Sequence, residues 1–225
     1  MLKKKKLRFI ELILLLGVVF LPSIIQSFYA LFSKEDIVSM RGGSLSFRFL
    51  HGIVWEALSL CLLIYFLYRR GKGLKDVGFS FKWKDILSGI ILFISITVLS
   101  IILQYVLKSL GIKIEQPRNI DFLKGNITIL YVLFIIINPF FEELIVRAFT
   151  MTEIEYLTGN AYLAALISTL LQTSYHLYQG LYSAFTLAVM FIVYSLFFGK
   201  YKRIAPVIIV HALFDIIAMM QFAAR

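Results

Sequence analysis

Six ionisable side chains interrupt three long apolar stretches of this 225-residue chain. A charged side chain near the centre of a bilayer costs about 2.5–3.5 kcal/mol on insertion scales, so such residues are treated first as candidates for function. Glutamate beside histidine can activate water, because the carboxylate takes the proton and an imidazole steers or shares it. The six residues are Glu142, Glu143, Arg147, His176, His211 and Asp215.

The same residue types could also bind a metal ion. Two imidazoles and one carboxylate, here His176, His211 and Glu142, can hold a divalent ion such as zinc and leave one position open for water. Either arrangement leads to hydrolysis inside the membrane, and the residues alone leave both open. No His-Glu-x-x-His, Gly-x-Gly-Asp or Gly-x-Ser-x-Gly motif indicates another kind of intramembrane protease.

Each position also has a purely structural interpretation. Glu143 and Arg147 are four residues apart, so they share a helix face and could form an ion pair. Glu142 would then remain without a local partner. His211 and Asp215 are likewise four apart, and a carboxylate that orients an imidazole need not be catalytic.

The depths expected for these residues agree. Residues 158–160, Thr-Gly-Asn, indicate a turn between two helices. Glu142 lies 17 residues before Gly159 and His176 lies 17 after it, so an antiparallel hairpin puts both at one level. His211 is eight residues past Arg203, about 12 Å along a helix. The sequence therefore predicts that these groups converge near one plane, closer to the cytosolic face.

The elements that must position them are membrane helices. Hydrophobic residues make up 60% of the chain and charged residues only 16%, which excludes a soluble enzyme. Cys61 is the only cysteine, which excludes an intramolecular disulfide. We expect an all-α, multi-pass bundle that forms one membrane domain over residues 1–225. Seven spans of sufficient length are predicted, at 9–31, 49–68, 86–107, 126–149, 161–180, 181–199 and 204–222.

Basic residues predict the orientation. With the N-terminus inside, the inner segments carry 14 Lys and Arg and the outer segments carry 8. This bias favours a cytosolic N-terminus and an outer C-terminus. The net charge of +10 comes with no aqueous basic domain, so we expect phospholipid as the partner and no nucleic acid. Residues 71–84 mix lysines with aromatic residues and are expected to lie among the inner headgroups.

At the polar residues the chain resembles the CPBP family of intramembrane proteases, also called Abi or CAAX-protease-like, which includes the type II CaaX prenyl endopeptidases. The family pattern is Glu-Glu-x-x-x-Arg, then Phe-x-x-x-His, then His-x-x-x-Asn/Asp. Residues 142–147 match the first element and residues 211–215 the third. The second matches only at His176, because Gln172 stands where phenylalanine is usual, and Ala148 replaces a frequent glycine. The resemblance covers roughly residues 126–222, the expected catalytic core.

The resemblance implies roles for the six residues. Glu142 and His176 would activate the water, and Glu143 would pair with Arg147 to position the site. His211 and Asp215 would stabilise the oxyanion, or His211 would be a metal ligand, since the family is commonly called metalloprotease. Because an ionised aspartate repels an oxyanion, Asp215 is expected to orient His211 or to stay protonated. Bacterial members point to a cell-membrane enzyme of peptide maturation or bacteriocin self-immunity, acting on a membrane-associated peptide or protein.

Two other functions stay open. A non-catalytic membrane protein could bind and sequester a peptide on the same fold, or a small proton-coupled carrier could use Glu142, Glu143 and His176 as a relay. Gln172 could hydrogen-bond within the site, but a neutral packing substitution is the favoured interpretation. Glu56, in the span 49–68, is expected nearer the outer side and away from the plane of the other residues.

Overall fold

The computed structural model describes residues 2–33, 44–113 and 128–223, and every element within them is helical. Residues 34–43 and 114–127 lie outside the described residues; they fall in the two predicted outer segments and include the first two residues of the predicted span 126–149. An all-α bundle is thus confirmed. The elements are α1 (Leu2–Ser33), α3 (Leu45–Arg69), η1 (Leu74–Val77), α4 (Trp83–Ser109), α5 (Ile129–Glu142), η3 (Glu143–Phe149), α6 (Thr150–Thr158), α7 (Ala161–His176), η4 (Leu177–Gln179), α8 (Leu181–Tyr201) and α9 (Ala205–Ala223).

Each of the seven predicted spans coincides with a helix, but the helices differ in length. Five continuous helical stretches of the described chain are long and apolar enough to cross a membrane: Lys3–Ser33, Leu45–Arg69, Trp83–Ser109, Ile129–Thr158 and Leu181–Tyr201. The helix α7 has 16 residues, and the apolar part of α9 runs over Ala205–Gln221. The chain is therefore an integral membrane bundle, while the count of seven crossings and the orientation stay predictions.

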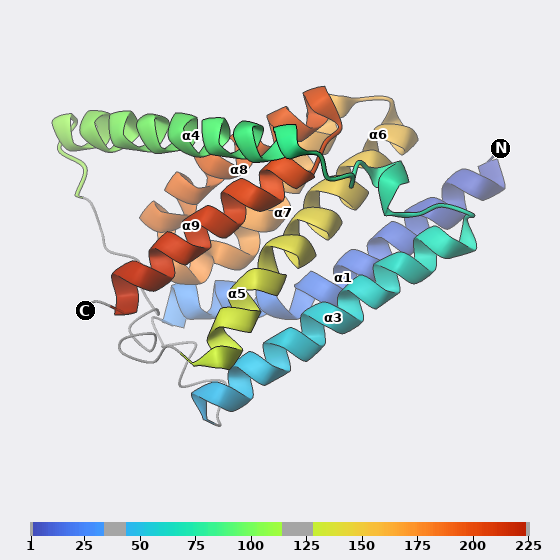
Figure 1. Ribbon diagram of the computed structural model, residues 1–225, viewed down its shortest axis with the longest axis horizontal. Coiled ribbons are helices and arrows are strands. Elements are labelled where there is room, and N and C mark those ends of the chain that lie inside the picture. The colour runs from blue at the N-terminus through green and yellow to red at the C-terminus, as the bar shows by residue number, and fades with distance from the viewer. Residues whose placement is uncertain (1, 34–43, 114–127, 224–225) are drawn as a thin grey trace.

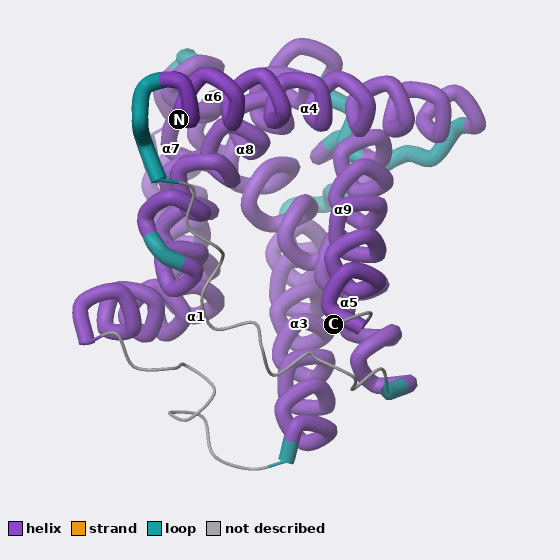
Figure 2. Tube along the Cα trace, turned by 90° about the vertical axis from the view of Figure 1, so that its left-hand side faces the viewer, coloured by secondary structure: helices purple, strands orange, loops and turns teal. Residues whose placement is uncertain are grey.

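The central hairpin, residues 129–176, packs against α1, α3, α8 and α9. In Figure 1, α3 and α9 lie on either side of α5, and α7 and α8 lie behind α9, in agreement with the contacts between these elements. Figure 2 shows α4 crossing the bundle at the end where α6 and the N-terminus lie. Only Asp85, Gly89, Leu92 and Ile96 are buried on α4. Most of the other side chains of this very apolar helix are exposed, as expected of a lipid-facing surface.

The segments predicted to be cytosolic gather at one end of the bundle. Arg8 of α1 donates to both oxygens of Glu153 in α6, at 2.7 and 2.6 Å. Arg70, which follows α3, bonds Glu153 at 2.8 Å and also Glu11. We call Arg8, Glu11, Arg70 and Glu153 the ion-pair cluster. Because this cluster ties α1, α3 and α6 together, the N-terminus, the end of α3 and the tip of the central hairpin share one end.

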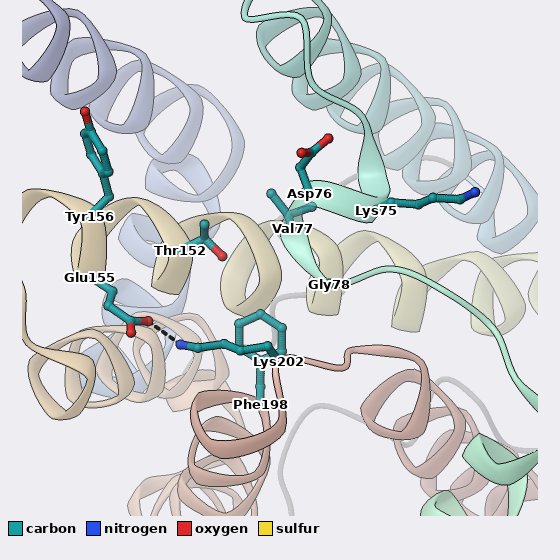
Figure 3. A pocket seen from close by; sticks show the side chains of 9 residues that line it. All are labelled: Lys75, Asp76, Val77, Gly78, Thr152, Glu155, Tyr156, Phe198 and Lys202. Atoms are coloured by element: carbon teal, nitrogen blue, oxygen red, sulfur yellow. Dashed lines mark hydrogen bonds and ion pairs between the residues drawn. The ribbon is translucent and has the colours of Figure 1, made fainter.

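A surface pocket lies at the same end, between η1, α6 and the turn from α8 to α9 (Figure 3). An ion pair between Glu155 and Lys202 closes one side of it. Gly78 has φ +90°, and a Cβ there would lie 2.6 Å from the carbonyl oxygen of Lys202, so the close approach requires glycine. None of the six ionisable residues that the sequence marks lies in this pocket.

The predicted turn of the central hairpin is confirmed. Helix α6 ends at Thr158, and Gly159 adopts the left-handed conformation at φ 73°. Asn160 then caps α7, because its side chain accepts a hydrogen bond of 3.0 Å from the backbone N–H of Leu163. The two arms therefore run back along each other, as the depth argument requires.

Candidate active site

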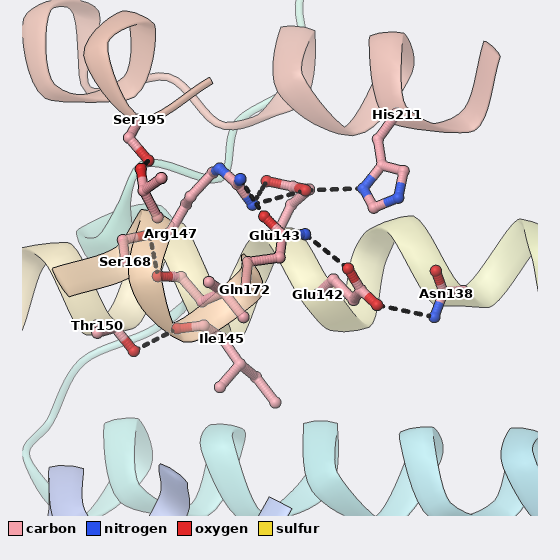
Figure 4. Close-up of polar contacts among 12 residues, drawn as sticks. Asn138, Glu142, Glu143, Ile145, Arg147, Thr150, Ser168, Gln172, Ser195 and His211 are labelled. Atoms are coloured by element: carbon pink, nitrogen blue, oxygen red, sulfur yellow. Dashed lines mark hydrogen bonds and ion pairs between the residues drawn. The ribbon is translucent and has the colours of Figure 1, made fainter. Parts of the chain in front are cut away.

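The first motif lies where the central helix changes its winding. Helix α5 ends at Glu142, and Glu143–Phe149 form the π-helical segment η3, in which every residue is buried. Pro139 lies one turn earlier, where it removes a backbone hydrogen bond. π-Helical turns are uncommon and occur frequently at functional sites. The altered winding directs Glu142, Glu143 and Arg147 toward α7 and α9 (Figure 4).

Glu143 is held from two sides by cationic or hydrogen-bonding groups. The Nη1 atom of Arg147 lies 2.9 and 2.8 Å from its two carboxylate oxygens, and both side chains are fully buried. From α9, Nδ1 of His211 lies 2.7 Å from Oε1 of Glu143. The structural ion pair expected from the spacing is thus present, and it is joined to the third motif.

Gln172 is at the centre of this arrangement rather than a packing substitution. Its side chain has no exposed surface. Its Nε2 donates to Oε2 of Glu142 at 2.6 Å, and its Oε1 accepts a hydrogen bond from Arg147. The favoured interpretation from the sequence was therefore wrong. An amide can donate and accept at once, so Gln172 links Arg147 to Glu142, which a phenylalanine could not do.

Glu142 is held by amides and not by a cation. Besides Gln172, the Nδ2 atom of Asn138 approaches its Oε1 at 3.4 Å from one turn earlier on α5. Only 6% of Glu142 is exposed. Arg147 reaches this carboxylate only through the Gln172 amide. Glu142 thus keeps acceptor capacity, and no arginine or lysine among the described residues contacts it directly.

His176 lies close to Glu142 but not in the register that the turn predicts. The two side chains interact electrostatically, and Nδ1 of His176 lies 2.9 Å from the backbone oxygen of Gln172. A carbonyl only accepts, so Nδ1 carries the proton in this contact and Nε2 is left for other partners. Direct contact across the hairpin is made by Gln172 with Glu142, and by Ser168 Oγ with the carbonyl of Val146 at 2.8 Å.

These contacts shift the predicted pairing by one helical turn. Gln172 is 13 residues after Gly159, whereas Glu142 is 17 residues before it. Part of the reason is the π-helical segment, which holds more residues per turn than an α-helix and so fits more chain into the same length.

Asp215 stands at the open side of the cluster. Its Oδ2 lies 3.6 Å from Nε2 of His211, which is wider than a direct hydrogen bond. The side chain of Asp215 is 28% exposed, whereas that of His211 is 7% exposed. The six ionisable residues therefore occupy one region, with Asp215 at its rim.

Glu56 also reaches this region, contrary to expectation. It is only 3% exposed, and its Oε1 accepts a hydrogen bond of 2.9 Å from Nδ2 of Asn138. The placement of Glu56 away from the other residues was therefore wrong. Asn138 precedes the family motif by four residues, and its spacing from Glu142 was the one signal that could have indicated a role.

The three candidate metal ligands do not converge as a ligand set. Among the residues that the structure describes, no three His, Cys, Asp or Glu side chains lie close enough together to hold one ion. Both oxygens of Glu142 accept from amides, and Nδ1 of His211 contacts Glu143. The donor set of Glu142, His176 and His211 therefore does not fit a zinc ion in this arrangement.

Comparison with known proteins agrees with the three motifs. The family model described as "Type II CAAX prenyl endopeptidase Rce1-like" matches residues 124–217. No curated protein and no solved structure matches the chain. The matched range contains Glu142, Glu143, Arg147, His176, His211 and Asp215, and it includes all of α5, η3, α6, α7 and α8. Over residues 124–217, this integral membrane protein is thus similar to the Rce1-like type II CAAX prenyl endopeptidases, which supports a CAAX-protease-like family.

Proposed function

We propose that the protein hydrolyses a membrane-associated peptide or protein with a water molecule activated by Glu142 and His176. The observation that carries this proposal is the state of Glu142. It is a buried carboxylate that is oriented by two amides, lies beside an imidazole, and has no direct cation partner among the described residues. A direct cation partner would stabilise a carboxylate that has a purely structural role. The same partner would lower the proton affinity of a carboxylate that must accept a proton from water.

The reaction follows the usual course of peptide hydrolysis. Glu142 takes a proton as the water oxygen bonds to the scissile carbonyl carbon. The same proton then passes to the leaving nitrogen as the C–N bond breaks, which gives a carboxylate and an amine. His176 steers the water from Nε2, since its Nδ1 proton is engaged by the backbone oxygen of Gln172. A fixed tautomer of this kind keeps the imidazole in one orientation.

The remaining groups support this step. His211, with a proton on each ring nitrogen, donates from Nε2 to the developing oxyanion and from Nδ1 to Glu143. Asp215 holds that imidazole from the rim. Arg147 compensates the charge of Glu143 and keeps Gln172 aimed at Glu142. Preorganised donors in a site with little water are worth more than the same donors in bulk water.

The proposed setting is a bacterial cell membrane, with a role in maturation of secreted peptides or in bacteriocin self-immunity. The substrate of the matched family is a prenylated CAAX protein by its description. For this chain we propose the broader class of membrane-associated peptides.

Intact-mass analysis of membrane peptides tests the proposal even while the substrate is unidentified. Three strains would be compared: one with the wild-type chain, one with Glu142→Gln, and one with neither. We expect pairs of masses in the wild-type strain in which a precursor falls and two fragments rise, with a net gain of one water. Such pairs should be missing from both other strains, while the Glu142→Gln protein is present in the membrane at the wild-type level.

The alternatives predict different patterns. A peptide-sequestering protein would change no masses, and Glu142→Gln would keep its biological activity. A proton-coupled carrier would move peptides between compartments without cutting them. Wild-type cleavage by the Glu142→Gln variant would contradict the proposed mechanism.

A further inference from the structure

Glu56 lies outside the matched residues 124–217 and has no role in the family motifs. It belongs to α3, which packs along α5 (Figure 1). Its side chain is buried, and Oε2 has no hydrogen-bond partner among the described residues. A carboxylate in an apolar environment is unfavourable, and a leucine or glutamine at this position would cost less. Packing alone therefore does not account for the residue.

The contact of Glu56 is with the residue that approaches Glu142. Asn138 Nδ2 donates to Glu56 Oε1 at 2.9 Å, and the same nitrogen lies 3.4 Å from Glu142 Oε1. The NH₂ group of asparagine has two hydrogens, one for each carboxylate. In Figure 4, the dashed line between Asn138 and Glu142 marks the longer of these two contacts.

The orientation of the amide is the property that Glu56 controls. Rotation of the Asn138 amide by half a turn would exchange its nitrogen and oxygen and place the oxygen against both carboxylates. Oε1 of Glu56 accepts from the amide in the observed contact, so this contact disfavours the rotated state, in which two oxygens would face each other. The shorter hydrogen bond, to Glu56, therefore decides the geometry of the longer one, to Glu142.

We propose that Glu56 is a positioning residue for the hydrolytic step. It orients the Asn138 amide, which in turn holds the carboxylate of Glu142 in the position from which it accepts the proton of water. This inference rests on the proposed function, because it assumes that Glu142 is the base.

A double-mutant cycle tests the inference with the full-length protein in cells. The readout is the rate at which cleavage products that depend on Glu142 accumulate, measured by intact mass after induction and divided by the amount of protein in the membrane. Glu56→Ala should lower this rate about tenfold, the size expected for loss of one hydrogen bond to a charged group. Glu56→Gln should recover most of the rate, because its oxygen can still accept from Asn138.

The effect of Glu56→Ala should disappear in an Asn138→Ala background, because the amide through which Glu56 acts is then missing. Ser59→Ala is the matched control. Ser59 lies one turn further along α3, is buried, and donates to the carbonyl of Trp55 in the same helix, at 2.7 Å. It should leave the rate unchanged. A wild-type rate for Glu56→Ala, or the same tenfold loss in both backgrounds, would overturn the inference.

A charge exchange covers the case in which Glu56→Ala does not accumulate. Glu56→Gln with Asn138→Asp restores a hydrogen bond between positions 56 and 138, but it directs a carboxylate instead of an amide at Glu142. A merely structural pair predicts that protein level and rate both recover. Positioning predicts a recovered protein level with a rate that stays at least tenfold low. If no product depends on Glu142 at all, the proposed function fails; if such products form and only these variants behave as wild type, this inference alone fails.

Discussion

Two buried groups of charged residues in this bundle differ in the balance between positive and negative charge. In the ion-pair cluster, two guanidinium groups face two carboxylates, and both glutamates contact an arginine directly. In the active site, the guanidinium of Arg147 is accompanied by four carboxyl groups, and of these only Glu143 touches it; the others are Glu56, Glu142 and Asp215. Amides and imidazoles fill the remaining positions.

The difference in charge balance separates a structural role from a catalytic one. A balanced cluster satisfies its own charges, so it can join α1, α3 and α6 but has no capacity left for a substrate. A cluster with unbalanced charge keeps a carboxylate that can still accept a proton. The unpaired charge lowers stability, and the surrounding hydrogen bonds offset this loss only in part. Substitutions in the two groups should therefore differ in whether they lower the stability, the cleavage rate or both.

Glu143→Gln should have the largest effect on stability. It leaves Arg147 fully buried without its carboxylate, and breaking a buried pair costs about 3–5 kcal/mol. Protein level and cleavage should both fall. Immunoblots of isolated membranes, together with thermal unfolding in detergent, would measure the effect. A normal protein level would show that neutral acceptors at positions 143 and 172 are enough to satisfy Arg147.

Arg8→Met should lower stability without affecting the chemistry. The methionine fills part of the space, but Glu153 loses its hydrogen bonds from Arg8 and keeps Arg70, so we expect a loss of about 1.5–3 kcal/mol. The unfolding temperature in detergent should fall, whereas cleavage per folded molecule should remain within about twofold of wild type, a difference below about 0.5 kcal/mol. A large loss of activity in the folded fraction would mean that the ion-pair cluster takes part in the reaction.

Gln172→Leu should lower the rate and affect stability less. It removes the donor to Glu142 and the acceptor for Arg147, and loss of a hydrogen bond to a charged group corresponds to about ten- to a hundredfold in rate. Thr173→Val is the control on the same turn, because the hydroxyl of Thr173 donates to the carbonyl of Thr169 in its own helix at 2.8 Å. Equal cleavage rates for the two variants would show that Gln172 has no role in the reaction.

Removal of metal should have the smallest effect. Because no three suitable side chains converge among the described residues, and Arg147 already supplies positive charge, we expect purified protein to keep its cleavage rate after treatment with a chelator. Metal content measured on the same sample completes the test. Zinc in stoichiometric amount, with activity that follows its removal and return, would establish the metal mechanism instead.

The sequence predicted the features that depend on local pattern. Apolar length predicted the helices, and Thr158 to Asn160 predicted the turn, because glycine after a helix and asparagine before one act through their own backbone. The ion pair between Glu143 and Arg147 followed from their spacing. The orientation of the chain in the membrane remains a prediction.

Features that depend on contacts between distant segments were missed. The role of Gln172 depends on having both Glu142 and Arg147 beside it, and that of Glu56 depends on the packing of α3 on α5. The ion-pair cluster joins residues more than 140 positions apart, so Arg8 could be interpreted from sequence only as an orientation signal. The pairing across the hairpin is shifted by one turn, in part because a π-helical segment cannot be expected from residue type.

The most direct test of the account is one chemical change made once in each group. Glu142→Gln and Glu153→Gln each replace a buried carboxylate by an amide of the same shape. For each purified variant, cleavage of the peptide identified by intact mass and the unfolding temperature would be measured side by side. We predict that Glu142→Gln unfolds near the wild-type temperature with a rate about 10²–10⁴-fold lower. Glu153→Gln should unfold earlier with a normal rate per folded molecule. The reverse pattern, an active Glu142→Gln or a folded but inactive Glu153→Gln, would contradict the account.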